Sequence, residues 1–203
     1  MVEQVIARRF YHATITNTYK QAFVLSQRIK AGIEDNPFFR FYETTLVYPT
    51  IDGNTGGTIN INAVEWLFRV RDGTIAPAPG ALAEKAVEVS QHYLMLSREL
   101  LLEQIRIEDF SGQPPSRQKC LFLCDTLEEA RAWCTLLGAQ GAICELSCTG
   151  RIHRGDSRLM VKISEPLSVT REKGRAYWRG EASADPRIEI LFEGDALVSA
   201  IGL

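Results

Sequence analysis

The sequence lacks the features that would place the chain in a membrane or export it through a cleavable leader. No apolar run approaches the roughly 18 residues that a membrane-spanning helix requires. Residues 1–5 include a glutamate and do not begin the apolar core of a signal peptide. These absences predict a cytoplasmic protein, or one secreted by a route that needs no classical signal peptide.

The sequence also lacks an excess of charge of either sign. It has 23 Lys and Arg against 25 Asp and Glu, so the formal net charge is −2. No global field therefore favours nucleic acid or a membrane surface. A length of 203 residues fits one sizeable domain, or one domain with a large insert.

Common catalytic motifs are missing as well, because the chain has neither a Gly-rich phosphate loop nor a credible Ser-His-Asp order. The cysteines are odd in number and several have apolar neighbours, which predicts buried reduced thiols. Cys144, Cys148 and the nearby His153 suggest a metal site as the less favoured alternative. Their spacing is not the usual zinc spacing and no second pair follows, so we expect no metal. The cysteines are Cys120, Cys124, Cys134, Cys144 and Cys148.

Three segments have the periodicity of helices. Residues 81–109 place apolar side chains at helical spacing, and their many charges suggest a solvated outer face. Residues 127–137 follow a capping box formed by Thr126 and Glu129. Residues 18–32 predict a third helix with Gly32 at its end.

Short apolar runs predict strands between these helices. They cover residues 5–15, 119–124 and 141–148, with a further candidate at 159–163. Residues 187–201 predict a hairpin that turns at Glu193–Asp195, because glycine beside an acidic residue is typical of a tight turn.

Three segments, in this order, resemble the ADP-ribosyltransferase superfamily. Tyr11–Thr14 is similar to the tyrosine–histidine–glycine–threonine strand of the poly(ADP-ribose) polymerases and the rifampin ADP-ribosyltransferases. Residues 120–130 resemble a strand with an aromatic side chain, followed by a capping turn and an alanine-rich helix. Residues 189–194 resemble the strand that carries the catalytic glutamate. These segments come from the two ends and the middle of the chain, and they are most similar to a poorly characterised bacterial subgroup with a long helical insert.

The resemblance implies an α+β fold. It would be a single domain over residues 1–203, built as a split β-sandwich of two packed, mostly antiparallel sheets. NAD would lie in the cleft between the sheets. A helical insert over about residues 66–112 would then act as a lid.

The resemblance also implies roles for individual residues. Glu189 would stabilise the positive charge that forms on the ribose when the bond to nicotinamide breaks. His12 would bond the second ribose, the backbone of Ala13 would hold the nicotinamide amide, and Thr14 would complete this cofactor-binding strand. Phe122 would stack on the nicotinamide ring.

Other polar and aromatic candidates are less specific. Arg117 follows a turn, where it is suited to bind the pyrophosphate. Tyr177 and Trp178 precede Glu189 in what we interpret as a loop, where they would grip the acceptor or, alternatively, pack the core. The basic stretch 151–179 would hold phosphates or a nucleic acid, or form a solvated surface.

Three positions depart from the family pattern. Ala13 stands where glycine is usual, and Phe122 where tyrosine is commoner. Arg187 occupies the position two residues before Glu189, where members that modify arginine carry a second acid. Arginine is therefore not the acceptor that we expect.

The resemblance implies a mono-ADP-ribosyltransferase, which is a glycosyltransferase that uses NAD as a substrate and releases nicotinamide. The acceptor would be a protein or a nucleic acid, and the biological role that of a toxin or effector with a possible antitoxin or immunity partner. The alternatives are an NAD glycohydrolase, an inactive binding module of the same fold, and an RNA phosphotransferase of related fold that relies on arginines in place of the glutamate.

Overall fold

The computed structural model describes residues 2–14, 23–34, 43–53, 55–136, 142–160 and 163–202. It divides the chain into two compact units, the larger made of residues 1–36 and 99–203, and the smaller of residues 37–98. Helices and antiparallel strands are both abundant, so the predicted α+β class is confirmed. Within the described residues, no helix is long and apolar enough to cross a membrane.

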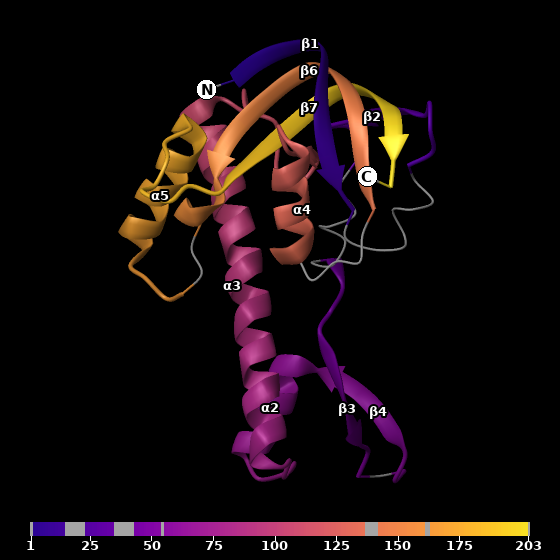
Figure 1. The fold of residues 1–203 in the computed structure, drawn as a ribbon. Coiled ribbons are helices and arrows are strands. Elements are labelled where there is room, and N and C mark those ends of the chain that lie inside the picture. The colour runs from indigo at the N-terminus through magenta and orange to yellow at the C-terminus, as the bar shows by residue number, and fades with distance from the viewer. Residues whose placement is uncertain are drawn as a thin grey trace. The chain divides into compact units, whose positions relative to one another are not determined.

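The larger unit is built on one antiparallel sheet (Figure 1). Its centre is β6 (Ile143–Asp156), which pairs along its length with β1 (Val2–Ala13) on one edge and β7 (Ile188–Ile201) on the other. The far edge of β7 pairs with two short strands, β5 (Leu121–Leu123) and β2 (Arg28–Ala31).

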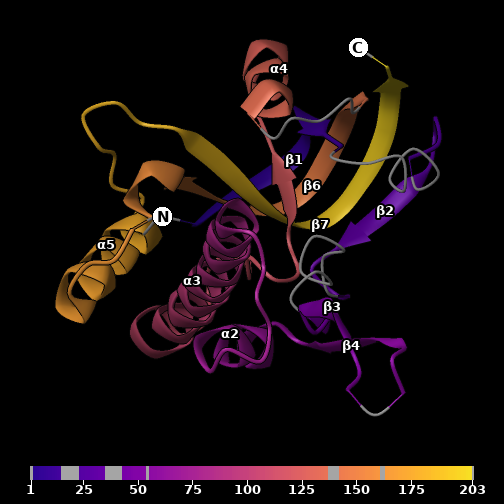
Figure 2. The same cartoon turned by 90° about the horizontal axis from the view of Figure 1, so that it is seen from below.

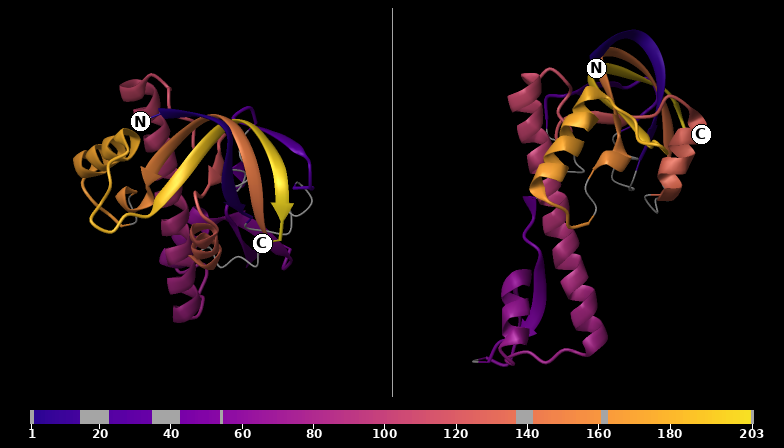
Figure 3. Two further views of the ribbon diagram at one scale, coloured as in Figure 1. Left: turned by 45° about the horizontal axis from the view of Figure 1, so that its top comes forward. Right: turned by 90° about the vertical axis from the view of Figure 1, so that its left-hand side faces the viewer.

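This sheet curls round until its two ends meet. Tyr11 of β1 and Cys124, just after β5, exchange both backbone hydrogen bonds, at 2.9 and 2.7 Å. The strands therefore close a ring in the order β1, β6, β7, β5 and back to β1. The strong curvature of β1, β6 and β7 is visible from two sides in Figure 3. A closed sheet has an inner and an outer face, and successive side chains of each strand alternate between them.

The inner face is packed with apolar side chains. Phe10 faces Leu146 across β1 and β6, and Ile152 faces Phe192 across β6 and β7, all four with no exposed surface. Cys144 and Cys148 lie in this core as free thiols. His153, five residues after Cys148 on the same strand, belongs instead to the outer face, so these three side chains do not form a metal site.

Helices cover the outer face at two places. Helix α4 (Leu127–Leu136) packs on Tyr11, Cys124 and Ile143. The last three turns of α3 (Pro79–Phe110) pack with α5 (Leu167–Arg179) on Phe122 and Leu191. A short 3-10 helix, η2 (Ser157–Leu159), follows β6. Figure 2 shows α4 and α5 at different parts of the curved sheet.

The smaller unit has its own apolar cluster. A two-stranded antiparallel ribbon, β3 (Val47–Ile51) and β4 (Thr58–Asn62), leads into α2 (Ala63–Arg71) and then into the first part of α3. The side-chain oxygen of Asn62 caps α2 by accepting from the N–H of Val64 at 2.9 Å. Tyr48 and Trp66 meet edge to face, with ring centroids 5.6 Å apart.

The predicted helices at 81–109 and 127–137 are confirmed as α3 and α4. The capping box is also present, since Thr126 and Glu129 exchange side chain to backbone hydrogen bonds of 3.2 Å in both directions. The buried side of α3 differs from the predicted one, however. Leu100 and Ile107 are exposed by more than half, while Leu102 and Ile105 pack on the sheet.

The predicted hairpin at 187–201 is wrong, because β7 is one continuous strand. Gly194 pairs with Gly150 of β6, and the two strands lie close together there. A Cβ atom on Gly150 would lie 2.2 Å from the carbonyl oxygen of Glu193, and one on Gly194 would lie 2.4 Å from that of Thr149. The glycines therefore permit the close approach of two paired, curved strands, and the chain makes no turn there.

Two further predictions are corrected. Residues 28–31, expected at the end of a helix, form strand β2 against β7, because Ile29 packs on the inner core. Residues 18–22 of that expected helix lie outside the described residues. A strand was expected at 159–163, but Leu159 is the last residue of η2. Residues 161–162 of that expected strand are likewise not described.

Candidate functional site

Glu189 lies on the outer face of β7, between the covering helices and the sheet. Its neighbours Ile190 and Phe192 belong to the inner core, whereas Leu191 packs on the outer side with α5. Alternation along the strand thus turns the Glu189 side chain outward, and the residue as a whole is 6% exposed. The sequence places a carboxylate in a strand otherwise made of strand formers, so its charge needs a partner there.

Arg117 and Tyr177 supply that partnership. One guanidinium nitrogen of Arg117, Nη1, donates to Oε1 of Glu189 and, at 2.7 Å, to the hydroxyl of Tyr177. The Tyr177 hydroxyl donates to the same Oε1 of Glu189 at 2.6 Å. Among the described residues, no hydrogen bond reaches Oε2 of Glu189, which leaves this oxygen as the one able to meet a ligand.

A second carboxylate, Glu99, occupies the other edge of the Arg117 guanidinium. Nε of Arg117 lies 2.7 Å from Oε2 of Glu99, and Nη2 lies 3.4 Å from Oε1. The side chains of Glu99, Arg117 and Glu189 are 2%, 5% and 8% exposed. We refer to Glu99, Arg117, Tyr177 and Glu189 as the Arg117 cluster.

The surroundings of the cluster shift several pKa values. Burial acts to lower the pKa of Arg117, but Glu99 and the polar groups around it more than offset this, so the pKa rises and the guanidinium stays charged. Burial raises the pKa of Tyr177, with Arg117 opposing it, so the phenol stays protonated and can donate. Burial likewise raises the pKa of Cys120 to about 12, so this thiol beside Arg117 is not a thiolate nucleophile.

The loop before Arg117 is fastened to the end of α3. Arg106 donates from Nη1 to the carbonyl oxygens of Gly112 at 2.7 Å and Pro114 at 3.0 Å, and its other nitrogens bind Glu103. The Ser116 hydroxyl also donates to Glu103, at 3.0 Å. Arg117 therefore enters the cluster from a loop that the half-buried side chains of Arg106 and Glu103 hold in place.

A buried aspartate fixes the segment just before Glu189. The side chain of Asp156, which has no exposed surface, accepts backbone N–H bonds from Arg158 at 2.9 Å and from Ser183 and Arg187 at 2.8 Å. Burial opposes ionisation, but these donors outweigh it and lower the pKa of Asp156. The start of β7 is thereby anchored next to the end of β6.

Phe122 lies on the same outer face as Glu189, since it pairs with Leu191. Its ring centroid is 5.2 Å from the guanidinium carbon of Arg117, a distance typical of a cation–π contact. The predicted site residues Glu189, Arg117 and Phe122 are therefore brought together, although they lie on three separate segments of the chain.

His12 faces the opposite side of the sheet. It pairs with Cys144 of the inner core, and its ring centroid is 5.0 Å from that of Phe23, another inner residue. Nδ1 donates to the carbonyl oxygen of Phe122 at 2.7 Å. Burial lowers the pKa of His12 despite this bond, so the ring is neutral at pH 7.

The two residues after His12 contact the backbone at the start of β6. Ala13 pairs with Ile143 at the end of β1. The buried Thr14 donates from its hydroxyl to the carbonyl oxygen of Ala142 at 2.8 Å. The structure therefore separates the side chain of His12 from that of Glu189 by the thickness of the sheet.

Tyr177 and Trp178 lie on α5, so the predicted loop at this place is wrong. Tyr177 has no exposed surface and Trp178 has 1%, and the indole N–H donates to the carbonyl oxygen of Leu102 at 2.8 Å. This placement agrees with the alternative that the two rings pack the core. His153 adds to it by donating from Nε2 to the Tyr177 carbonyl oxygen at 3.1 Å.

The basic stretch 151–179 is distributed over β6 and α5, and most of its cations are engaged by acids. The pairs join Arg151 to Glu193, Arg154 to Glu3 and Asp125, Arg158 to Asp185, Lys173 to Glu165, Arg175 to Asp109, and Arg179 to Glu172 and Glu181. This agrees with a solvated, ion-paired surface.

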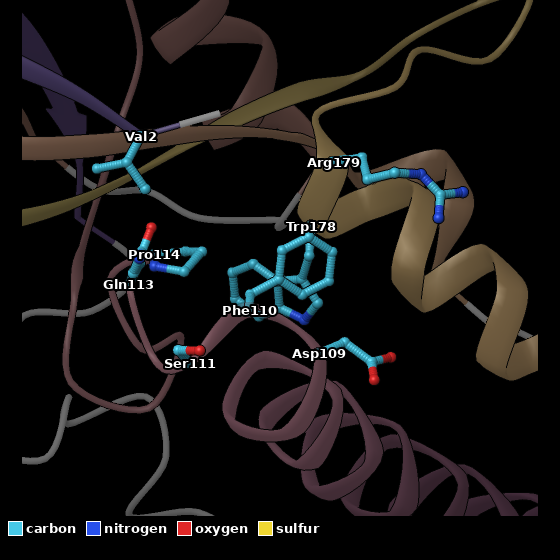
Figure 4. A pocket seen from close by; sticks show the side chains of 8 residues that line it. All are labelled: Val2, Asp109, Phe110, Ser111, Gln113, Pro114, Trp178 and Arg179. Atoms are coloured by element: carbon cyan, nitrogen blue, oxygen red, sulfur yellow. The ribbon is translucent and has the colours of Figure 1, made fainter.

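A pocket of about 460 Å³ is lined by the C-terminal ends of α3 and α5, the loop after α3 and Val2, apart from the Arg117 cluster. Figure 4 shows the packed rings of Phe110 and Trp178 in it, with the charged groups of Asp109 and Arg179 farther out. Asp109 is bound by Arg175 at 2.8 Å, and Arg179 by Glu172 at 3.0 Å. No member of the Arg117 cluster lines this pocket, so it is not the place where Glu189 would meet a ligand.

Glu99 is the member of the cluster that sequence reasoning missed. Its many charged neighbours on α3 suggested a solvated face. The signal that could have revealed it is its spacing, because Glu99, Leu102 and Ile105 follow one another at intervals of three residues and share one side of the helix. Glu99 is buried on the same side of the helix as these two apolar residues.

The fold and site define a class of α+β protein in which helices cover a closed antiparallel sheet and enclose a buried cluster of two carboxylates, an arginine and a tyrosine. The chain belongs to the family described as "Protein of unknown function (DUF2441)", which matches residues 10–201. Comparison with curated proteins gives no match.

Proposed function

We propose that the chain cleaves the bond between nicotinamide and ribose in NAD and transfers the ADP-ribose to a protein or nucleic-acid acceptor. The observation that carries this proposal is the convergence of Glu189, Arg117 and Phe122 around one point of the outer face. The fold would then be related to the ADP-ribosyltransferases.

Glu189 is the residue to which we assign the chemistry. The C1′–N1 bond of NAD breaks with its electron pair leaving on nicotinamide, whose ring becomes neutral, while positive charge develops on the ribose. A carboxylate beside that ribose stabilises the charge. The acceptor then forms a bond to C1′ and loses a proton. Oε1 is held by Arg117 and Tyr177, so Oε2 is the oxygen that would face the ribose.

The remaining candidates take supporting roles. Phe122 offers an aromatic face beside Arg117 on which a nicotinamide ring can stack. His12 acts indirectly, because its hydrogen bond to the Phe122 carbonyl fixes the backbone of β5. Ala13 and Thr14 support the same end of β1, and Tyr177 orients Glu189. A guanidinium that already binds two carboxylates is poorly placed to bind pyrophosphate, so the proposal does not depend on Arg117 for that.

The acceptor decides between related activities. Water as acceptor would make the chain an NAD glycohydrolase, with the same role for Glu189. A macromolecular acceptor would suit a toxin or effector, which an antitoxin or immunity protein would restrain.

A binding module without catalysis is the second candidate, and the burial of Glu189 favours it. The side chain of Glu189 is 8% exposed and bound to a guanidinium, so NAD reaches the carboxylate only if part of the covering layer moves. The fold would then bind its partner without cleaving a nucleotide.

Nicotinamide release from NAD by the purified chain separates these candidates. Glu189→Gln keeps the shape of the side chain and removes its charge, and we expect it to lower the rate about 10²- to 10³-fold. Glu193→Gln is the matched control, because this glutamate lies on the same strand and pairs with Arg151 at the surface. We expect its rate to equal that of the unaltered chain.

Labelled NAD incubated with a cell lysate then distinguishes transfer from hydrolysis. Label in protein or nucleic acid supports a transferase, and free ADP-ribose supports a glycohydrolase. If the folded chain releases no nicotinamide under any condition, the enzymatic proposal is wrong and the binding module takes its place.

A further inference from the structure

Two acids share one guanidinium in the Arg117 cluster, and this sharing sets the charge of the site. The formal charges of Glu99, Glu189 and Arg117 add to −1, since Tyr177 is neutral. A pair of Arg117 and Glu189 alone would be neutral and would give little stabilisation to a positively charged group. With both carboxylates ionised, the cluster would carry one net negative charge.

The contacts divide the guanidinium between the two acids. Glu99 takes Nε and Nη2, which form one edge of the planar group, and Glu189 takes Nη1. Arginine presents its donors in a rigid fork, so fixing one edge also fixes the direction of the others. Glu99 lies on α3, while Glu189 lies on β7, so two elements hold Arg117 from opposite sides.

We propose that Glu99 is a positioning residue for Glu189: it fixes Arg117 and leaves Glu189 with the negative charge that NAD cleavage requires. This inference rests on the proposed function. Glu99 itself touches no reacting atom in it. Its effect reaches the ribose only through Arg117 and Glu189.

The test is a comparison of Glu99→Gln with the unaltered chain in nicotinamide release. Glutamine can still accept from Nε of Arg117, but the charge is gone. We expect kcat to fall about 10- to 100-fold, as is usual when an outer partner of a reactive group is removed. We expect KM, and the NAD affinity measured by calorimetry, to change less than the rate. If Glu99 had a purely structural role, the substitution would change kcat, KM and the NAD affinity together, along with the midpoint of denaturant unfolding.

Glu108→Gln is the control, because Glu108 lies on the same helix, is exposed, and bonds only Gln104 among the described residues. Release by the unaltered chain with an unchanged kcat in Glu99→Gln would overturn the role of Glu99 and leave the proposed function standing. No release by the unaltered chain would overturn the proposed function and this inference with it. A fall in kcat matched by an equal fall in NAD affinity would also overturn the positioning role.

Discussion

Two groups of charges in the larger unit use the same chemistry in opposite surroundings. The Arg117 cluster is buried and combines two carboxylates with one guanidinium. The other group, which we call the surface ring, joins Glu3 to Arg8, Arg8 to Asp125, Asp125 to Arg154 and Arg154 to Glu3. Its four side chains are 31% to 45% exposed, and its charges balance.

The two groups differ in what the loss of one member costs. The surface ring links β1 to β6 and to the turn before α4. Water can replace each of its contacts, so the loss of one member costs little stability. A buried cluster has no such replacement, and the loss of one member leaves charges without a partner. Replacing a buried ion pair by apolar side chains of the same volume is often neutral or stabilising, so stability alone does not account for the charges of the cluster.

Removal of Arg117 should have the largest effect. Arg117→Met leaves two carboxylates in a space almost closed to water, and we expect the free energy of unfolding to fall by about 3–5 kcal/mol. Urea denaturation followed by circular dichroism measures this fall. The double variant Arg117→Met with Glu99→Gln has one carboxylate fewer, so it should recover part of the loss. A double variant less stable than Arg117→Met would contradict the charge argument.

Asp156 sharpens the comparison, because it is a buried carboxylate satisfied by backbone donors without a cation. Asp156→Asn should lower the free energy of unfolding by about 1–3 kcal/mol at pH 7. The native fold lowers the pKa of Asp156 below its ordinary value near 3.9, so the stabilisation is complete above that pH and is lost as the pH falls through the native pKa. Denaturation curves of both proteins from pH 7 to pH 2 should therefore converge at the acidic end. A constant difference would show that the ionised carboxylate is not the cause.

The smallest effect is expected in the surface ring. Arg154→Met removes contacts to Glu3 and Asp125, yet we expect the free energy of unfolding to change by about 1 kcal/mol or less. The change should shrink further between low salt and 1 M salt, where the screening length is about 3 Å. A loss as large as that of Arg117→Met would abolish the distinction between the two groups.

The sequence predicted local structure best where a local motif has a single structural meaning. The capping box at Thr126 and Glu129 located the start of α4, because cap chemistry is local. The prediction of a turn at Glu193–Asp195 was wrong because glycine is common both in turns and where paired strands lie very close together. The pairing of Gly194 with Gly150 identifies the second case. That pairing joins residues far apart in the chain, which no local pattern encodes.

The candidate site was predictable in the same uneven way. Glu189 and Phe122 were identified from a resemblance and Arg117 from its place after a turn, and the structure brings the three together. Glu99 was missed because the many charges of α3 suggested a solvated face, and because leucines at 100, 101 and 102 make more than one side of the helix apolar. The packing of Leu102 and Ile105 with Trp178 shows which side faces inward. The position of His12 on the inner face depends on how the sheet closes, which is a tertiary property.

The closure of the sheet has a consequence for the order of folding. Strand β1 pairs with β6 about 140 residues later, and β7 follows all of its partners in the chain. A nascent chain can form α3 and α4 early, but it cannot close the ring until β7 has been synthesised. Because Glu189 lies on β7, the buried charges meet only at the end of this sequence of events. Folding should accordingly be slow for the size of the unit, and C-terminal truncation before residue 188 should prevent assembly of the Arg117 cluster.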